Sequence, residues 1–506
     1  LFYLDNRNGI NYGLPWIRPA ANSPASDATV LPLDPSNYYG MASDFNKGSA
    51  GYGTFSWQRR LDDGGLIKSQ VRYGNYERDQ RASTIRLCQG TTNPNTGVYT
   101  PNANCPTTVN ANLSNFGPAS VLTRGTQLKI QNLQTVYAQS DYINTFNWGG
   151  LRHEVLAGVD YALEKKQVYA QLSAAQGGYN PAKPNTTAGT PDDGAWINES
   201  ARVLRLASEY KAQGIGVYAQ DLVQVAPAWK VLGGLRYDYL TGDYDTFSIP
   251  ANAASPTTTS SYRMRVSEWS WRLGALYQPN PLDSYYASAA TSFNTSGDAY
   301  SLSAANQNIP PEQSANLEIG AKLDSADKRF TTRLAAFYST KYQERNTDPL
   351  VNLVTLSGKR HVAGVELDLT GRLTRQWEMF TSLMWMPIAV IDVAAPGQGV
   401  EAQGSRPSLT PTFSGTFWNT YQIDPKWRVG LGLNFRGKQT PNRNPGWEVP
   451  GYLTADLMAE YTFSEKLAVK GYLSNLANTL YANSLYTGHY VPGPGRLFQL
   501  TASLKF

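Results

Sequence analysis

The chain has 506 residues, and only 16% of them are charged, well below the roughly 25% typical of a soluble domain. Glycine (44), tyrosine (32) and tryptophan (12) are abundant instead, a mixture that disfavours helices and favours strands and turns. A soluble all-α protein is therefore excluded. So is an α-helical membrane protein, because no stretch approaches about 18 uninterrupted apolar residues. The net charge of +5 is spread without a basic tract, so nucleic-acid binding has no support.

Apolar and polar residues alternate along much of the chain, which is the pattern of strands with one solvated face. In the last such segment, Phe498, Leu500 and Leu504 alternate with polar residues. The alternation predicts about 18 strands. They are expected, in chain order, at residues 1–7, 49–61, 66–88, 126–147, 151–172, 200–226, 229–247, 262–278, 284–295, 312–323, 328–343, 352–372, 376–391, 405–423, 426–437, 451–463, 466–476 and 495–506.

Short and long connections alternate between these segments. Tight turns are expected at 62–65, 148–150, 227–228, 324–327, 424–425 and 464–465, and long polar loops at 8–48, 89–124, 173–199, 248–261, 296–311, 392–404, 438–450 and 478–493. A β-sandwich gives no reason for this sorting, whereas an outer-membrane barrel has short periplasmic turns and long outer loops. Trp229, Trp377 and Trp427 directly follow short turns, as an aromatic girdle at one membrane interface would. The alternative is that they are ordinary strand-edge tryptophans.

The only two cysteines, Cys88 and Cys105, flank a polar loop segment. Two lone cysteines in one such loop predict a disulfide in an oxidising compartment, with two unpaired thiols as the alternative.

The sequence offers no catalytic set and no metal site. The three histidines, His153, His361 and His489, lack metal-ligand spacing, and no nucleophile or phosphate-binding motif is present. We therefore expect no enzyme. Charged residues opposite the apolar strand faces are expected to point into a barrel lumen, because an Arg or Lys facing lipid near the midplane would cost about 2–4 kcal/mol. They are Arg236, Asp238, Glu318, Lys322, Glu366, Asp368, Arg436, Asp456, Glu460, Lys470 and Lys505.

Several segments resemble the barrel of TonB-dependent siderophore receptors. They include GVYAQDLVQVAPAWKVLGGLRYD at 216–238, PEQSANLEIGAKL at 311–323 and GKRHVAGVELDLTGR at 358–372. The end of the chain, SNLANTLYANSLYTGHYVPGPGRLFQLTASLKF at 474–506, is similar to the family's C-terminal signature. The opening NYGLPWIRP and the loop DPSNYYG at 34–40 resemble the subgroup that takes up catecholate or hydroxamate siderophores, with the catecholate group nearer.

The resemblance implies an all-β transmembrane antiparallel barrel of 22 strands with an N-terminal plug, of which residues 1–506 would form a barrel domain of about 18 strands. The plug, the TonB box and the first strands would then precede Leu1. It further implies an outer-membrane receptor of a Gram-negative bacterium, surrounded by lipid and lipopolysaccharide, that transports ferric siderophores actively through TonB. Iron would arrive already chelated, so no intrinsic cofactor and no protein ligand to the metal are expected.

Ligand recognition is expected in the long loops, where Tyr and Trp can stack on an aromatic chelate and Arg can balance its negative charge. The candidates are Tyr12, Trp16, Arg18, Tyr38, Tyr39, Arg345, Arg443, Trp447 and Tyr490. Three alternatives stay open: a passive substrate-specific porin, a receptor for another iron chelate such as a hydroxamate, and a barrel that acts as an adhesin or signalling receptor.

Overall fold

The computed structural model describes residues 1–92, 99–101, 105, 110–252, 257–295, 302–304, 306–348, 353–394, 401–441, 448–486 and 488–505. Nearly all of the regular structure in these ranges is β-strand, and the helical elements there are three 3-10 turns. No helix within the described ranges is long and apolar enough to cross a membrane.

The strands are β1 (Phe2–Asn8), β2 (Leu14–Pro15), β3 (Phe45–Arg60), β4 (Leu66–Leu87), β5 (Gly90–Thr92), β6 (Tyr99–Pro101), β7 (Val121–Trp148), β8 (Leu151–Gln171), β9 (Thr186–Thr187), β10 (Leu204–Ala226), β11 (Trp229–Ser248), β12 (Thr258–Tyr277), β13 (Asp283–Asn294), β14 (Glu312–Asp324), β15 (Phe330–Asp348), β16 (Leu353–Arg372), β17 (Trp377–Val393), β18 (Phe413–Gln422), β19 (Trp427–Arg436), β20 (Tyr452–Thr462), β21 (Leu467–Ser474), β22 (Ala482–Leu485), β23 (His489–Pro492) and β24 (Leu497–Leu504). The 3-10 turns are η1 (Ala25–Asp27), η2 (Ala174–Gln176) and η3 (Glu199–Ala201).

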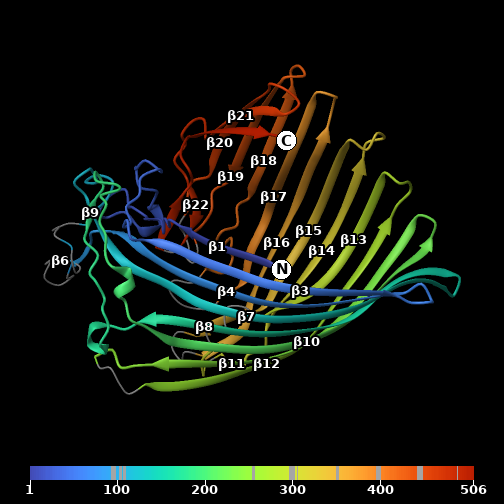
Figure 1. Ribbon diagram of the computed structural model, residues 1–506, viewed down its shortest axis with the longest axis horizontal. Helices are drawn as coiled ribbons and strands as arrows, with labels where there is room; N and C mark the ends of the chain where they lie inside the picture. Colours follow the sequence, from blue (N-terminus) through green and yellow to red (C-terminus); the bar gives the residue numbers. More distant parts are fainter. Residues whose placement is uncertain are drawn as a thin grey trace.

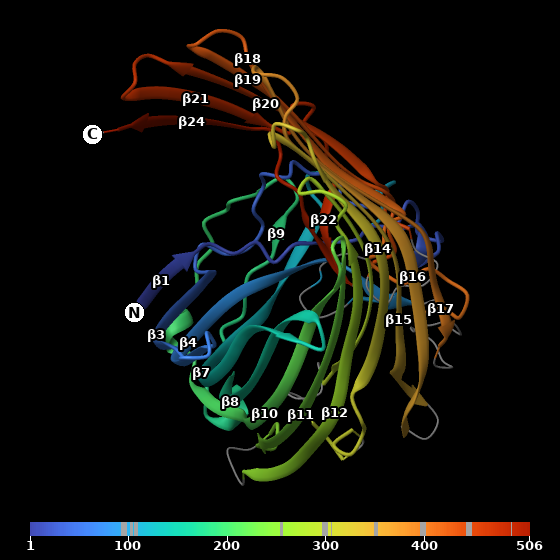
Figure 2. The same ribbon diagram turned by 90° about the vertical axis from the view of Figure 1, so that its right-hand side faces the viewer.

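The long strands form one antiparallel wall in which chain neighbours are also sheet neighbours. β1 pairs with β3, and each long strand then pairs with the next as far as β21 and β24. Figure 1 shows the short turns gathered at one end of this wall and the long loops at the other. In the turned view of Figure 2 the wall curves into an open arc, with β1 and β24 on opposite sides of its opening.

This wall confirms the predicted series of strands and the alternation of short and long connections. The β7–β8 hairpin turns through Gly149 and Gly150, whose φ angles of 61° and 79° suit the left-handed region that a two-residue hairpin requires. Each predicted strand corresponds to one long strand of the wall. Completion of the arc to 22 strands stays a prediction.

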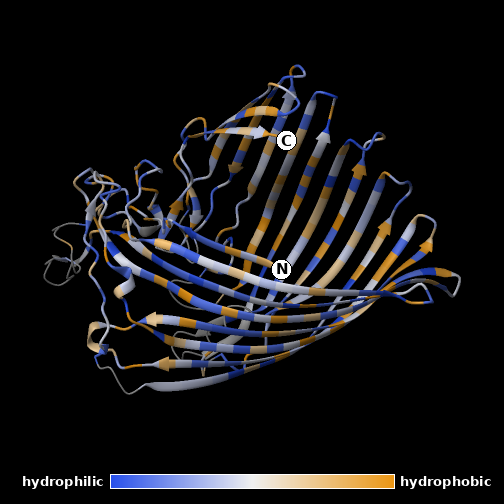
Figure 3. Ribbon diagram, in the orientation of Figure 1, coloured by the Kyte–Doolittle hydropathy of each residue, from blue (hydrophilic) through white to orange (hydrophobic). Residues whose placement is uncertain are grey.

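The two faces of the wall differ as the alternation predicts, and Figure 3 shows hydrophobic and hydrophilic residues alternating along the strands. One face exposes apolar side chains such as Val217, Leu235 and Ile319. The other face carries paired charges: Arg236 Nη1 lies 2.6 Å from Asp160 Oδ2. The apolar face is the one that lipid can cover, and the polar face lines the inside of the arc.

One predicted strand is shorter than expected. The segment 405–423 was expected to be extended throughout, but β18 begins only at Phe413. Pro407 and Pro411 lie in the part that precedes β18, and proline has no backbone N–H to give to a sheet.

The loop segments are also more ordered than their polar composition predicts. β2, β22 and β23 form a small three-stranded sheet that joins loops from opposite ends of the chain. We call residues 9–44, 172–203 and the described parts of 475–496 the loop cap. The first and third of these segments share a buried apolar cluster with the upper ends of β4 and β7.

Candidate ligand-binding site

The centre of the loop cap is built around Trp16 and Tyr490. Their rings lie 4.7 Å apart, and the Trp16 indole N–H donates to the Tyr486 carbonyl at 3.1 Å. The Tyr490 hydroxyl accepts from the Leu31 amide at 2.8 Å, and its side chain is 0% exposed. Buried tyrosines and tryptophans normally have such partners for their polar atoms. Trp16 and Tyr490 therefore hold two distant loops together, which is a packing role.

A cavity of about 1050 Å³ adjoins this centre. The cavity lies between the first loop, the tops of β4 and β7, and the loop after β22. Its wall includes the cations Arg18 and Arg86 and the rings of Tyr12 and His489. The remaining lining includes Trp16, Gln89, Asn110, Asn112, Thr123 and Gln127.

Part of the cavity lining projects to the inner face of the wall. On β4, Arg86 and Thr84 are separated from Gln70 by an even number of residues, so they are in phase with it and share its face. The Gln70 amide donates to Gln139 on the polar face. The exposed apolar residues Val71 and Tyr73 are out of phase with them. Because side chains alternate strictly along a strand without a bulge, Arg86 projects to the polar side.

Three rings stack along one side of the cavity. The imidazole of His489 lies 5.2 Å from the Tyr12 ring and 4.6 Å from the Tyr486 ring, with interplanar angles of 21° and 11°. Burial, reinforced by the charge of Arg86, lowers the pKa of His489. Burial, followed by the nearby Tyr486, raises the pKa of Tyr12. Both shifts favour the uncharged forms of His489 and Tyr12, and the positive charge of the cavity comes from its arginines.

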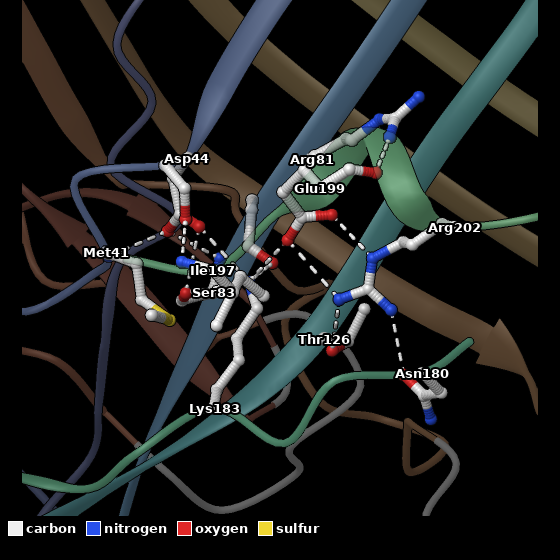
Figure 4. A network of polar contacts seen from close by, with 12 residues as sticks. Met41, Asp44, Arg81, Ser83, Thr126, Asn180, Lys183, Ile197, Glu199 and Arg202 are labelled. Carbon is white, nitrogen blue, oxygen red and sulfur yellow. Dashed lines mark hydrogen bonds and ion pairs between the residues drawn. The ribbon is translucent and has the colours of Figure 1, made fainter. Parts of the chain in front are cut away.

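A buried polar network fixes the neighbouring part of the loop cap (Figure 4). Lys183 Nζ lies 3.1 Å from Asp44 Oδ1 and 3.6 Å from Glu199 Oε1. Arg202 Nε lies 2.5 Å from the other oxygen of Glu199. Asp44 also accepts from the Ser83 amide at 2.8 Å. These contacts join residue 44, strand β4 and the segment 172–203 in one unit.

Tyr38 and Tyr39 belong to this packed region. The Tyr38 hydroxyl donates to Asp44 Oδ2 at 3.0 Å, and burial, followed by the Asp44 charge, raises the pKa of Tyr38. The Tyr39 hydroxyl donates to the Ala188 carbonyl at 2.9 Å, and the side chain is buried. Both tyrosines contact protein rather than the cavity.

The remaining candidates lie elsewhere. Arg345 is on β15, where its backbone amide donates to Glu312 Oε1 at 3.2 Å. Arg443 and Trp447 fall outside the described residues. Of the sequence candidates, the cavity thus brings together Tyr12, Trp16 and Arg18.

Sequence reasoning missed Arg86 and His489 as cavity residues. Arg86 lies on a strand that was expected to be wall, and His489 was considered only for metal binding. A signal was available for His489, since it directly precedes the candidate Tyr490.

The predicted disulfide is present: Cys88 and Cys105 are joined, with Cα atoms 5.4 Å apart.

A wall with an apolar outer face, short turns at one end and a loop-built cavity at the other defines a ligand-binding outer-membrane barrel protein. The chain belongs to the TonB dependent receptor-like β-barrel family, whose family model matches residues 1–476. Members of this family are receptors and not enzymes, and the chain is accordingly an outer-membrane β-barrel receptor.

Individual relatives agree with this assignment. The chain is 24% identical over 533 residues to the probable TonB-dependent receptor BfrD of Bordetella pertussis, covering 100% of the chain and 67% of BfrD. It is 23% identical over 548 residues to the catecholate siderophore receptor Fiu of Escherichia coli K12, covering 100% of this chain and 67% of Fiu.

Two solved structures share the fold. The closed form of the ferric-catecholate import receptor Fiu superposes with a TM-score of 0.81 at 22% identity, covering 100% of this chain and 71% of Fiu. The siderophore receptor PiuA of Acinetobacter baumannii gives a TM-score of 0.81 at 20% identity, covering 99% of this chain and 70% of PiuA.

Proposed function

We propose that the protein imports ferric siderophores across the outer membrane, that catecholate chelates are its preferred class, and that TonB supplies the energy. The observation that supports this most is the loop cavity, which combines two arginines with a stack of uncharged rings in a barrel of the TonB-dependent receptor family. The names of Fiu and PiuA, which are siderophore receptors, support the same class of ligand.

The chemistry of the cavity suits a ferric tris-catecholate. Such a complex carries three negative charges and presents flat aromatic faces. Arg18 and Arg86 can offset part of that charge, and the Tyr12–His489 stack offers a ring edge and face for the catechol rings. Because the iron is already chelated, the ligand needs only outer contacts and no protein atom bound to the metal.

We propose further that the intact barrel has 22 strands and contains an N-terminal plug that carries the contact with TonB. Two observations support this. The chain covers only 67% of BfrD and of Fiu, and 71% of the solved closed form of Fiu. Strands β1 and β24 lie apart across the opening of the arc, and open sheet edges do not face lipid in membrane proteins.

A binding titration on the purified full-length protein tests the ligand class. The probes are a ferric tris-catecholate and, for comparison, a ferric hydroxamate. Since a hydrogen bond to a charged group contributes about 1.5–3 kcal/mol, we expect Arg86→Ala to weaken catecholate binding roughly tenfold or more. Arg263→Ala is the matched control, because Arg263 forms an exposed ion pair with Asp243 away from the cavity.

Each alternative has its own outcome. Binding of the hydroxamate alone would keep the importer and overturn the catecholate preference. Uptake in cells that does not depend on TonB would support a passive channel instead. If neither chelate binds, the siderophore proposal is wrong.

Trp447 and Arg443 remain proposed ligand contacts, and they belong to a loop with prolines at 441, 445 and 450 that limit its freedom. Trp447→Ala should weaken chelate binding by about 1–3 kcal/mol if the ring is a buried anchor.

A further inference from the structure

A histidine and an aspartate form a close pair on the wall. His153 of β8 and Asp221 of β10 meet through Nδ1 and Oδ2 at 2.6 Å. The histidine is only 7% exposed, because its ring stacks on Phe146 at 5.5 Å and 11° and lies 5.8 Å from the Trp148 ring.

This pair lies on the apolar outer face. On β8, His153 is in phase with the exposed Val159 and Leu163, whereas Asp160, which pairs with Arg236, projects to the opposite face. On β10, Asp221 is in phase with the exposed Ile215 and Val217. Neither strand has a register shift between these positions, so the alternation assigns the pair to the lipid side.

The pair also lies close to the end of the wall that carries the short turns. His153 follows the Gly149–Gly150 turn by three residues, which is about 10 Å along a strand. Trp148 and Trp229 are exposed at the same end, as expected of aromatic side chains at the headgroups of the inner leaflet. The pair is therefore at headgroup level rather than in the middle of the hydrocarbon layer.

Two polar atoms of the pair have no hydrogen-bond partner among the described residues: His153 Nε2 and Asp221 Oδ1. In the tautomer whose Nδ1–H donates to the Asp221 carboxylate, Nε2 carries a lone pair. Both atoms are thus acceptors, and buried acceptors without partners are uncommon. Two acceptors side by side next to aromatic rings are suited to a ligand that donates several hydrogen bonds and carries positive charge.

We propose that His153 and Asp221 bind the primary ammonium of a phospholipid headgroup, such as ethanolamine, in the inner leaflet. A primary ammonium has N–H groups for both acceptors. Choline has none, and an anionic headgroup would be repelled by Asp221. The Trp148 ring, which is 73% exposed and lies 5.8 Å from the His153 ring, can add a cation–π contact to the headgroup.

The chain contains a matched comparison. His361 of β16 pairs with Asp392 of β17 and also stacks on a ring, that of Tyr338, at 5.5 Å. There the histidine Nδ1 lies 2.9 Å from both oxygens of Asp392. This second pair belongs to the same outer face but is close to the loop end of the wall, and neither residue is among those with a buried unpartnered atom in the described ranges.

The experiment uses the full-length protein with ¹⁵N-labelled histidines, which include His153, His361 and His489. NMR spectra are recorded in nanodiscs of phosphatidylethanolamine and of phosphatidylcholine. We expect the Nε2 resonance of His153 to move to a hydrogen-bonded position only with phosphatidylethanolamine. His153→Gln assigns the resonance, and His361→Gln should leave it unchanged. Identical His153 spectra in the two lipids would overturn the proposal.

A second measurement does not depend on a histidine variant. In native mass spectrometry, the wild-type protein should retain phosphatidylethanolamine over phosphatidylglycerol, and Asp221→Asn should lower that preference roughly tenfold, as expected for the loss of a charged hydrogen bond. Asp392→Asn is the control and should retain the preference. Equal retention in Asp221→Asn and wild type would contradict the site. A response to soluble ethanolamine without one to the lipid would overturn the assignment to a membrane headgroup.

Discussion

Lys183 and Asp44 are 139 residues apart in the sequence, yet Lys183 Nζ lies 3.1 Å from Asp44 Oδ1 and both side chains are 1% exposed. The pair connects the first long loop to the segment 172–203, and it does so above the upper end of β4, where Lys183 also donates to the Ala82 carbonyl at 3.0 Å. A buried pair of this kind makes the arrangement of the loop cap specific.

Removing one partner of this pair should open the cap. Lys183→Met leaves Asp44 buried without its counter-charge, and breaking a buried pair in this way costs about 3–5 kcal/mol. We expect amide exchange in residues 172–203 to accelerate, while the barrel strands keep their protection. Hydrogen exchange followed by mass spectrometry measures both regions in one sample.

Two controls make this test specific. Lys438→Met removes an ion pair of similar length, 2.8 Å to Glu448, but both of its side chains are exposed, at 68% and 59%. It should change local protection by less than about 1 kcal/mol. The double variant Asp44→Asn with Lys183→Met should recover part of the lost protection. Equal effects of Lys183→Met and Lys438→Met would contradict the role assigned to burial.

Gly13→Ala should separate the first loop from the loop that follows β22. Gly13 has a φ of 102°, and an added Cβ would lie 2.3 Å from the Tyr490 carbonyl oxygen. Strain of about 1–3 kcal/mol is therefore expected at this position. Limited proteolysis should cut residues 9–44 faster in this variant. Gly9→Ala, where nothing lies within 4 Å of the added Cβ, should behave like wild type.

Acid should loosen the cap through His489. Its pKa is lowered in the folded protein by burial and then by Arg86, so the unfolded segment binds a proton more readily. The stability that the neutral ring contributes is full above the unfolded pKa of about 6.5 and falls as the pH drops through the folded pKa. We expect amide protection in residues 482–486, corrected for intrinsic rates, to fall between pH 7.5 and pH 5.

Arg86→Gln tests whether His489 causes the loss of protection at low pH. Without the nearby cation, the pKa of His489 moves back toward its ordinary value, so the loss of protection at pH 5 should shrink. His489→Gln should abolish the pH dependence altogether. An unchanged pH profile in both variants would show that another group is responsible.

The disulfide between Cys88 and Cys105 should be needed for the order of its loop and not for the barrel. A closed loop of this size gives about 3 kcal/mol in the chain-entropy model. We expect no alkylatable thiol in the unreduced protein by mass spectrometry. The double Ser variant should fold but lose its loop to protease, and two alkylated cysteines in the unreduced wild type would refute the pairing.

The sequence by itself determined the wall. Strand periodicity is a local property, because successive side chains point to opposite faces whatever the distant partners are. The sequence alone therefore predicts that residues such as Leu235 and Ile319 lie on the apolar face of the wall. The sorting of turns and loops was readable for the same reason. The resemblance of the last 33 residues to a family signature then indicated the class of receptor.

Only the tertiary structure decided the site. Trp16 and Tyr490 were both aromatic loop residues by sequence, but their hydrogen-bond partners lie more than 450 residues away, and this contact packs the two rings together beside the cavity. His489 and Arg86 gained their role from the same long-range contact. The function of a loop side chain depends on which other segments of the chain contact it. A local sequence pattern does not predict these contacts, because the buried clusters and ion pairs of the loop cap form between residues far apart in the chain.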